Sequence, residues 1–395
     1  MQPCLMDFRD TAAEAAFRAK LRDWYGRNFD PAANPSAGRP DVDYMRSWSR
    51  KLHDAGYVGL TWPKEYGGAG LSPGYQAIYF EEMARAHAPE HIGIIGLNMA
   101  GPTIMAWGTP EQKQRHLPKL LSGEEIWCQG FSEPGSGSDL AGARTTAVLD
   151  GDHWVVNGQK VWSSWAHIAD WCILVVRTDP AAKKHEGLSY LLVDMHAPGV
   201  EVRPLRQITG DPEFNEIFFT DVRVPKESIL GRPGDGWKVA MTTLLHERGT
   251  LAFALVGQLR QHFTRLVELA RQPASDGSVP AGDPVVRDAI AREWIELQSL
   301  AFTNYRTLTT LLTKGQPGPE SSVVKLVWSE ANQRLTKLAR GLQGLSGMLD
   351  DDGGVWDGYW QYRQLRSRGN TIEAGTSEIL RNIVAERVLG LPRSR

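Results

Sequence analysis

The sequence is poor in cysteine, and this limits the kinds of protein that it can encode. Its three cysteines, Cys4, Cys128 and Cys172, are widely spaced in a chain of 395 residues and form no Cys-x-x-Cys pair. A disulfide framework uses an even set of cysteines, and a zinc cluster uses closely spaced pairs. The sequence therefore argues against both, predicts no metal site, and fits a protein of the reducing cytoplasm.

Long apolar runs and blocks of like charge are also missing. The most apolar stretches, Ile92–Leu97 and Trp171–Val176, fall far short of the roughly 20 residues that cross a bilayer. Asp7, Arg9 and Asp10 stand where a signal peptide needs an apolar run. The charges nearly cancel, with 44 basic and 46 acidic residues for a net charge of −2. We therefore expect neither membrane insertion nor a nucleic-acid partner.

Several common enzyme motifs are absent as well. The chain has no strand–GxGxxG–helix unit, no P-loop, no GxSxG and no HExxH. These patterns mark dinucleotide, nucleoside-triphosphate, serine-hydrolase and zinc-protease sites. The sequence therefore predicts no Rossmann-type nucleotide site.

What the sequence does contain is an order of helices, strands and helices. Up to about residue 125, apolar residues recur at three- and four-residue spacing, which is typical of helices. From about residue 127, short stretches rich in β-branched and aromatic residues alternate with turn residues, which is typical of a small barrel or sandwich. From Trp237 the helical spacing returns in long pieces joined by short loops, which favours an antiparallel bundle.

These patterns predict individual elements and a domain organisation. Helices are expected at 8–29, 41–55, 74–88 and 110–121, and again at 237–272, 284–314, 319–348 and 376–390. Strands are expected at 154–164, 171–178, 187–195, 200–205 and 215–225. The expected fold is α+β and multidomain, with an N-terminal helical domain at 1–126, a small central β-barrel at 127–235 and a C-terminal helical bundle at 236–395.

Two stretches of the central part have the chemistry of a binding site. The run Phe131–Leu140 (FSEPGSGSDL) holds a Pro-Gly turn among small hydroxyl residues, and such a turn exposes backbone N–H groups to a polar ring edge or an anion. The run Val161–Trp165 (VWSSW) follows an expected hairpin turn at Asn157-Gly158, and its indole and hydroxyl suit a flat heterocycle. The simpler interpretation of the first run is a surface hairpin loop, and that of the second is a core tryptophan in a strand.

The C-terminal part carries two candidate bases. Glu247 is surrounded in sequence by apolar residues, and desolvation there would raise its pKa toward the range of a general base. An exposed helix charge pair explains Glu247 and Arg248 equally well. Thr376 is the expected N-cap of a helix with Glu378 in its first turn, a structural role that needs no chemistry. Glu373, just before this helix, is the second candidate.

In order along the chain, these residues resemble the acyl-CoA dehydrogenase family. Further matching segments are Leu60–Gly68 (LTWPKEYGG) and Gly108–Glu124, and the most specific pieces are SEPGSGSD and Gly375–Ile379 (GTSEI). The resemblance covers nearly the whole chain and implies the family's fold, with a C-terminal four-helix bundle. It also implies FAD between barrel and bundle, α,β-dehydrogenation of an acyl-CoA to the 2-enoyl-CoA, and electron transfer to an electron-transfer flavoprotein.

The resemblance assigns cofactor roles to individual residues. The residues so assigned are Phe131, Ser132, Trp162, Ser164, Thr376 and Glu378. The first two match the pyrimidine edge of the flavin, the tryptophan matches its ring face, and Ser164 matches a contact near its reactive nitrogen. The last two match residues that hold the adenosine half.

The resemblance also bears on the substrate and the base. Many members place the base directly before the Gly-Thr pair, where this chain has Ala374, with Glu373 one residue away. Isovaleryl- and long-chain-type members place it on an earlier helix before an arginine, as in Glu247-Arg248. We therefore expect Glu247 to take the α-proton while flavin N5 takes the β-hydride, with Glu373 as runner-up. Ser138 and Arg248 are expected to contact the substrate, and the backbone N–H of Ala374 the thioester oxygen.

One departure from the family concerns assembly. The usual Arg-x-x-Phe-Gly motif, which reaches FAD in a neighbouring subunit, is missing at 270–277. The chain is thus expected to be a homo-oligomer (dimer or tetramer) with a substitute cation, or part of a heterotetramer like bacterial enzymes of sterol side chains. An acyl-CoA oxidase-like enzyme and a flavin-poor subunit remain alternatives. The glycines Gly93, Gly96 and Gly101 suggest either room for a bulky acyl group or close helix packing.

Overall fold

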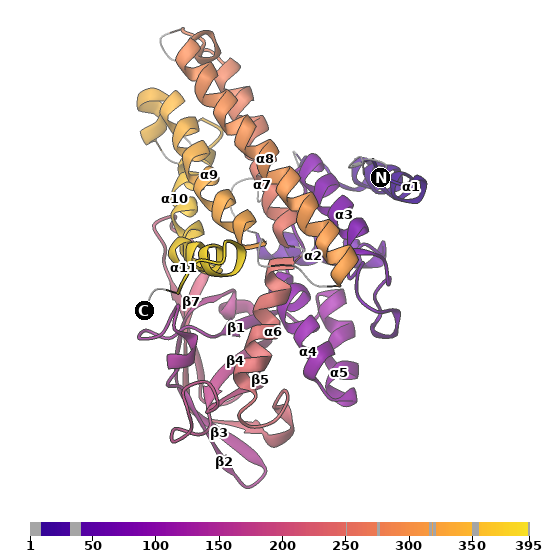
Figure 1. The fold of residues 1–395 in the computed structure, drawn as a ribbon, viewed down its shortest axis with the longest axis vertical. Coiled ribbons are helices and arrows are strands. Elements are labelled where there is room, and N and C mark those ends of the chain that lie inside the picture. The colour runs from indigo at the N-terminus through magenta and orange to yellow at the C-terminus, as the bar shows by residue number, and fades with distance from the viewer. Residues whose placement is uncertain are drawn as a thin grey trace.

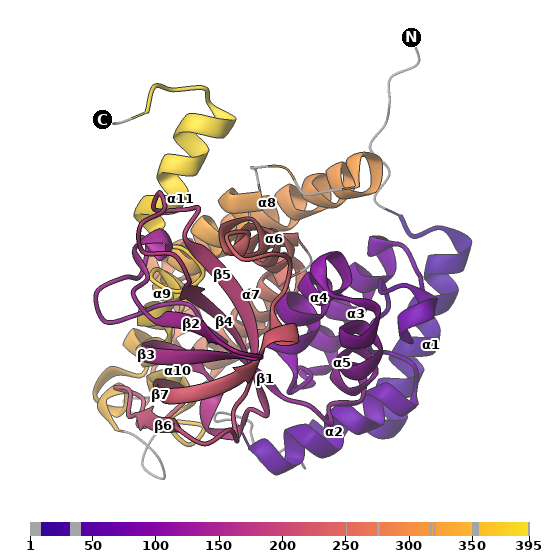
Figure 2. The same cartoon turned by 90° about the horizontal axis from the view of Figure 1, so that it is seen from below.

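Along the chain, a curled sheet follows the N-terminal helices and precedes the C-terminal helices. In space the sheet lies at the lower end of the view in Figure 1, below the C-terminal helices. The computed structural model describes residues 9–31, 41–249, 251–274, 277–315, 318, 321–349 and 355–393, without the side chains of 247–249 and 251. Seen from below, the sheet occupies one side of the molecule and the N-terminal helices the other (Figure 2). This arrangement confirms the predicted α+β architecture of helices, strands and helices.

The described residues of the N-terminal part form five α-helices. They are α1 (Ala12–Asn28), α2 (Val42–Asp54), α3 (Pro73–Ala86), α4 (Gly101–Trp107) and α5 (Pro110–Ser122). Three of them, α1, α2 and α5, begin with a side-chain N-cap. Thr11 and Thr109 each begin a helix with a complete capping box, in which the threonine side chain and the third residue satisfy each other's backbone N–H groups. Helix α4, which follows a π-helical turn at Gly96–Ala100, was not predicted from the sequence.

The glycines of this segment allow close packing. A Cβ atom on Gly96 would lie 2.5 Å from Leu120 Cδ2, and one on Gly101 would lie 2.2 Å from the Trp62 ring. Both positions therefore have room only for hydrogen, since real Cβ contacts are not that short. Of the two interpretations of these glycines, close helix packing is the one that the structure supports at Gly96 and Gly101.

The middle part is a seven-stranded sheet. Its strands are β1 (Trp127–Gly130), β2 (Thr146–Asp150), β3 (His153–Ser164), β4 (Trp171–Arg177), β5 (Leu188–Asp194), β6 (Val200–Leu205) and β7 (Phe214–Pro225). The order is β1-β4-β2-β3-β7-β6, with β5 antiparallel to β4. In the pairings among described residues, β1, β5 and β6 each pair with a single strand, so the central part is a curled sheet that these pairings do not close into a barrel.

The Asn157-Gly158 pair is not the expected hairpin turn. It lies inside β3, where the pairing with β7 shifts register between Val156 and Gly158. Gly158 has a φ of 150°, and a Cβ atom there would lie 2.6 Å from Thr145 Oγ1. The glycine therefore allows a bulge in a long strand. The hairpin turn of this region contains Gly151 and lies between β2 and β3.

The C-terminal part is helical. Its helices are α6 (Gly236–Gly249), α7 (Leu251–Arg271), α8 (Pro284–Lys314), α9 (Ser321–Leu342), α10 (Tyr359–Asn370) and α11 (Ser377–Ile383), which continues as a π turn at Val384–Val388. The predicted helix 284–314 is confirmed, whereas the predicted helix 237–272 is two helices and α10 was not predicted. A core that includes Leu266, Leu297 and Trp328 joins α7, α8 and α9. No helix among the described residues is long and apolar enough to cross a bilayer.

Candidate active site

The loop that starts at Phe131 is anchored by a buried ion pair. Lys160, on β3, is fully buried and its Nζ donates to Glu133 Oε1 (2.8 Å) and to the Phe131 carbonyl (3.2 Å). The Glu133 carboxylate also accepts from the backbone N–H groups of Arg144 (2.7 Å) and Thr145 (2.8 Å). Burial by itself raises the pKa of Glu133, but the Lys160 charge and these hydrogen bonds outweigh it and keep the pKa below its usual value. The loop is thereby fixed to the sheet.

This anchor brings the two predicted central motifs together. The carbonyl of Ser132 accepts from the N–H of Val161 (2.9 Å), so the start of the loop runs beside the end of β3. The Phe131 ring is buried edge-on against Tyr190, with centroids 5.8 Å apart. The hydroxyls of Ser132 and Ser164 are half-buried and bond to no described residue. Ser138 is exposed farther along the loop.

Trp162 has an unusual backbone and an uncovered side chain. Its φ is 62°, and its side chain is 61% exposed although it belongs to a strand. A non-glycine residue in this region costs about 1–3 kcal/mol unless its surroundings enforce it. The indole packs edge-on against the Phe214 ring, with the ring centroids 6.2 Å apart. The neighbouring Ser163 hydroxyl is buried without a partner in the described part of the chain. The exposed indole and the half-buried hydroxyl of Ser164, two positions farther along the strand, suit a flat polar ring.

Arg366 of α10 connects this surface to the C-terminal loop. Its guanidinium lies 5.6 Å from the centre of the Phe214 ring and donates to Glu213 (3.0 and 3.2 Å). It also donates to Glu373 Oε2 (3.1 Å). The contacts from Trp162 through Phe214 and Arg366 to Glu373 therefore join residues that lie more than 200 positions apart in the sequence.

The carboxylate of Glu373 is occupied on both oxygens. Besides Arg366, it accepts a 2.6 Å hydrogen bond from Asn370 Nδ2. Asn370 Oδ1 accepts from Asn332 (2.9 Å), whose Oδ1 lies 2.8 Å from Nδ1 of the buried His262. Burial, together with the Arg363 charge, lowers the pKa of His262 to about 3, so the ring is neutral and donates. Glu373 thus ends a hydrogen-bonded row that starts in α7.

The loop after Glu373 has a free backbone donor. Ala374 has a φ of 52°, and its N–H donates to no residue that the structure describes. The next carbonyl, that of Gly375, accepts from Lys325 Nζ (2.7 Å), which fixes the loop to α9. An immobilised, unpaired N–H at the protein surface is suited to donate to a ligand oxygen.

The remaining predicted site residues lie on helices. Thr376 caps α11 by accepting from the N–H of Ile379 (3.2 Å), and Glu378 is exposed in the first turn. Hydrogen bonds at the helix start, from its own N–H and from Thr376, lower the pKa of Glu378. Thr376 and Glu378 therefore both serve the start of α11. Neither takes part in the chain of contacts from Trp162 to Glu373. Glu247 and Arg248 belong to α6, but their side chains lie outside the described residues.

Three residues that build this site were not predicted from the sequence: Lys160, Arg366 and Asn370. For Lys160 there was a signal, because it is the one charged residue among the buried positions of β3. For Arg366 and Asn370 there was none, since their partners are fixed by tertiary contacts.

Comparison with known proteins agrees with this architecture. The family models described as acyl-CoA dehydrogenase N-terminal, middle and C-terminal domains match residues 11–124, 128–222 and 234–389. The chain is 44% identical over 384 residues to acyl-CoA dehydrogenase IpdE1 of Mycobacterium tuberculosis (strain ATCC 25618 / H37Rv), covering 95% of this chain and 97% of that protein.

Solved structures give the same result. The fold is similar to the Tcur3481-Tcur3483 steroid ACAD, with a TM-score of 0.88 and 33% identity, over 98% of this chain and 100% of that one. It is also similar to the ChsE4-ChsE5 complex from Mycobacterium tuberculosis, with a TM-score of 0.86 and 32% identity over the same shares. The chain therefore belongs to the acyl-CoA dehydrogenase family and is an oxidoreductase.

Proposed function

We propose that the chain is an FAD-dependent enzyme that converts an acyl-CoA to the 2-enoyl-CoA. The observation that carries this proposal is the exposed indole of Trp162 on a left-handed backbone. Phe131, Ser132 and Ser164 stand beside it as candidate partners of the flavin ring, and Thr376 and Glu378 are proposed for the adenosine half. FAD bound at this surface supplies the acceptor of the β-hydride.

We propose Glu247 as the base that takes the α-proton. The occupied carboxylate of Glu373 supports this choice, because Arg366 and Asn370 already bind both of its oxygens. The position of Glu247 in α6 also supports it. It follows Thr243 by one helical turn, and the buried Thr243 hydroxyl bonds to Tyr190 (3.0 Å), the residue that packs on Phe131.

We propose that the N–H of Ala374 donates to the thioester oxygen. Removal of an α-proton places negative charge on that oxygen, and a fixed donor stabilises the charge without reorganisation. The donor is unpaired among the described residues and the loop is held by Lys325 and Arg366. Ser138 and Arg248 remain proposed substrate contacts.

We propose a bulky, steroid-type acyl group as the substrate and a related, unlike subunit as the partner. One of the similar structures is named as a steroid ACAD, and another is a complex of two differently named chains. The missing Arg-x-x-Phe-Gly motif at 270–277 supports the unlike partner, although residues 275 and 276 lie outside the described part.

We propose a cytoplasmic enzyme that passes its electrons to an electron-transfer flavoprotein. Cys128 and Cys172 are buried free thiols at facing positions of β1 and β4, and a reducing compartment keeps such a pair reduced. Hydrogen peroxide formed during turnover would instead indicate an acyl-CoA oxidase.

The test is anaerobic mixing of the purified protein with short, branched, long and sterol-derived acyl-CoAs while flavin absorbance is followed. Glu247→Gln is expected to keep FAD and to lose flavin reduction by at least about 100-fold, the range of one general base. Glu268→Gln, which removes the charge of another carboxylate, on α7, is the matched control, and its flavin should be reduced at the normal rate. Normal reduction in Glu247→Gln would overturn the assignment of the base.

A further inference from the structure

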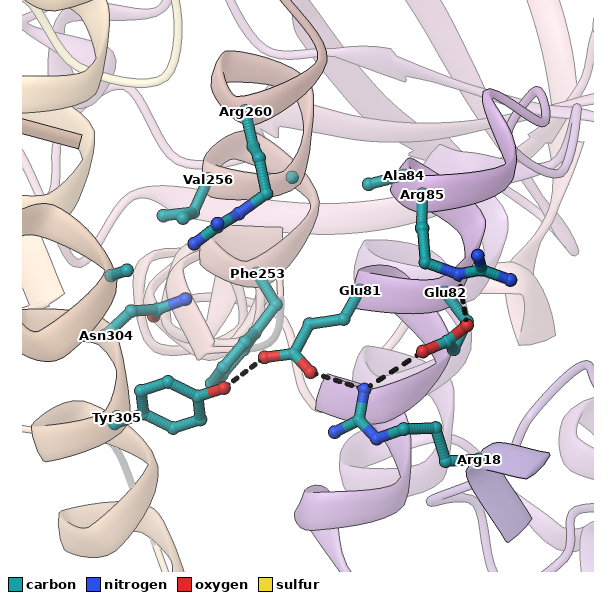
Figure 3. Close-up of a pocket in the computed structure, with 12 residues that line it drawn as sticks. Arg18, Glu81, Glu82, Ala84, Arg85, Phe253, Val256, Arg260, Asn304 and Tyr305 are labelled. Atoms are coloured by element: carbon teal, nitrogen blue, oxygen red, sulfur yellow. Dashed lines mark hydrogen bonds and ion pairs between the residues drawn. The ribbon is translucent and has the colours of Figure 1, made fainter. Parts of the chain in front are cut away.

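A cavity lies between the N-terminal helices and the C-terminal bundle, and none of its lining residues belongs to the surface around Trp162 (Figure 3). It measures about 280 Å³ and is lined by residues of α1, α3, α7 and α8. Phe253, Val256 and Ala301 form its apolar part, and Arg260 and Asn304 are polar groups on α7 and α8. None of these residues belongs to the machinery proposed above.

The acids at this cavity are already neutralised. Glu82 accepts from Arg22 (2.7 Å), Arg85 (2.9 Å) and Arg18 (3.2 Å). Burial by itself raises the pKa of Glu82, but these three arginines outweigh it and lower the pKa to about 2. Glu81 accepts from Arg18 (2.8 Å) and from the Tyr305 hydroxyl, as the dashed lines in Figure 3 show. No carboxylate among the residues described at this cavity is therefore left over for a cation.

Arg260, in contrast to these acids, has a charge that no described residue pairs. Its guanidinium makes no hydrogen bond or ion pair with any residue of the described ranges. Figure 3 shows it extending from α7 toward the side of the cavity where Asn304 stands on α8. The positive charge of the cavity lining is thus not fully balanced, and an anion would be attracted.

Asn304 adds an unsatisfied amide to this charge. Its side chain is 1% exposed, and neither Oδ1 nor Nδ2 has a partner in the part of the chain that the structure describes. A buried polar group without a partner destabilises the fold by about 1–3 kcal/mol, so native structures rarely leave one unfilled. An amide that can donate and a guanidinium that extends toward it from α7 match the two oxygens of a carboxylate.

We propose that this cavity binds a small monocarboxylate, with its carboxylate on Arg260 and Asn304 and its apolar body on Phe253, Val256 and Ala301. A dianion such as phosphate fits less well, because Arg260 is the one unpaired arginine among the described lining residues and Glu81 is near. A volume of about 280 Å³ suits a short acid. The site is separate from the flavin surface, and the proposal does not depend on the reaction.

The test is calorimetric titration of the purified, flavin-loaded protein with pentanoate. Pentanamide and inorganic phosphate are the comparison probes. We expect saturable binding of one pentanoate per chain, and binding at least about tenfold weaker for both comparison probes, because the amide lacks the charge and phosphate lacks the apolar body. Arg260→Gln should weaken pentanoate binding at least about tenfold, the usual effect of losing a hydrogen bond to a charged group. Arg271→Gln, at the C-terminal end of the same helix, should leave it unchanged.

Asn304→Leu keeps the test decisive if Arg260→Gln does not fold. This variant removes the unsatisfied amide, so its melting temperature should not fall, while its pentanoate binding should weaken at least about tenfold. Absence of saturable pentanoate binding would mean that the cavity holds only water. Unchanged binding in the variants, or equally tight phosphate binding, would also overturn the proposal.

Discussion

At the scale of the residue, Trp162 combines a left-handed backbone with an exposed aromatic side chain. Its left-handed φ of 62° is strained for tryptophan and acceptable for glycine. In Trp162→Gly the relief of strain opposes the lost Phe214 contact, so the free energy of unfolding of the apoprotein should change by no more than about 1 kcal/mol. FAD affinity should fall about tenfold or more, because stacking on an aromatic side chain contributes about 1–3 kcal/mol. The ratio of flavin to protein absorbance after gel filtration measures FAD retention, and thermal melts measure stability.

The control is Trp294→Ala, which removes an exposed tryptophan of α8. Undiminished flavin content in Trp162→Gly would contradict the role of Trp162 in covering the flavin ring.

At the scale of the element, Lys160 attaches the Phe131 loop to β3. Lys160→Met should destabilise the protein by about 3–5 kcal/mol, because it leaves the Glu133 charge buried without its partner. The double variant Lys160→Met/Glu133→Gln should recover much of this loss, since the uncompensated charge is gone. Urea unfolding of both variants measures the free energies. A single variant that is no less stable than the double variant would mean that the ion pair does not hold the loop. Lys184→Met, which removes an exposed pair with Asp139, should change stability by less than about 1 kcal/mol.

At the scale of the whole molecule, the missing Arg-x-x-Phe-Gly motif bears on assembly. A pyrophosphate without that cation loses a charge-assisted hydrogen bond, so the chain purified alone should carry less than one FAD per chain. Co-expression with a related, unlike subunit should raise the FAD content and give a mixed oligomer. Native mass spectrometry with flavin absorbance measures both quantities. One tightly bound FAD per chain in the lone protein would contradict an obligate heteromer and favour a homo-oligomer with a substitute cation.

The element order is the part of the structure that the sequence predicted best. Helix 284–314 was predicted to the residue because its apolar spacing is regular and Asp283 caps it. The Asn157-Gly158 pair was misassigned because a turn-forming pair also fits a bulge, and only the pairing of β3 with β7 distinguishes the two. The tyrosine- and tryptophan-rich α10 was missed because its helical pattern is weak and its burial against α9 is tertiary.

The sequence by itself determined the helix–strand–helix order and the family, because periodicity, turn residues and short motifs are local. Only the tertiary structure decided that Glu373 is bound by Arg366 and Asn370, that Trp162 is exposed on a left-handed backbone, and that the N–H of Ala374 is unpaired among the described residues. Arg366 and Glu213 are 153 positions apart, and no spacing rule reaches that far. Local patterns specify which elements form, whereas packing of distant elements decides which polar groups are satisfied and which remain open to a ligand.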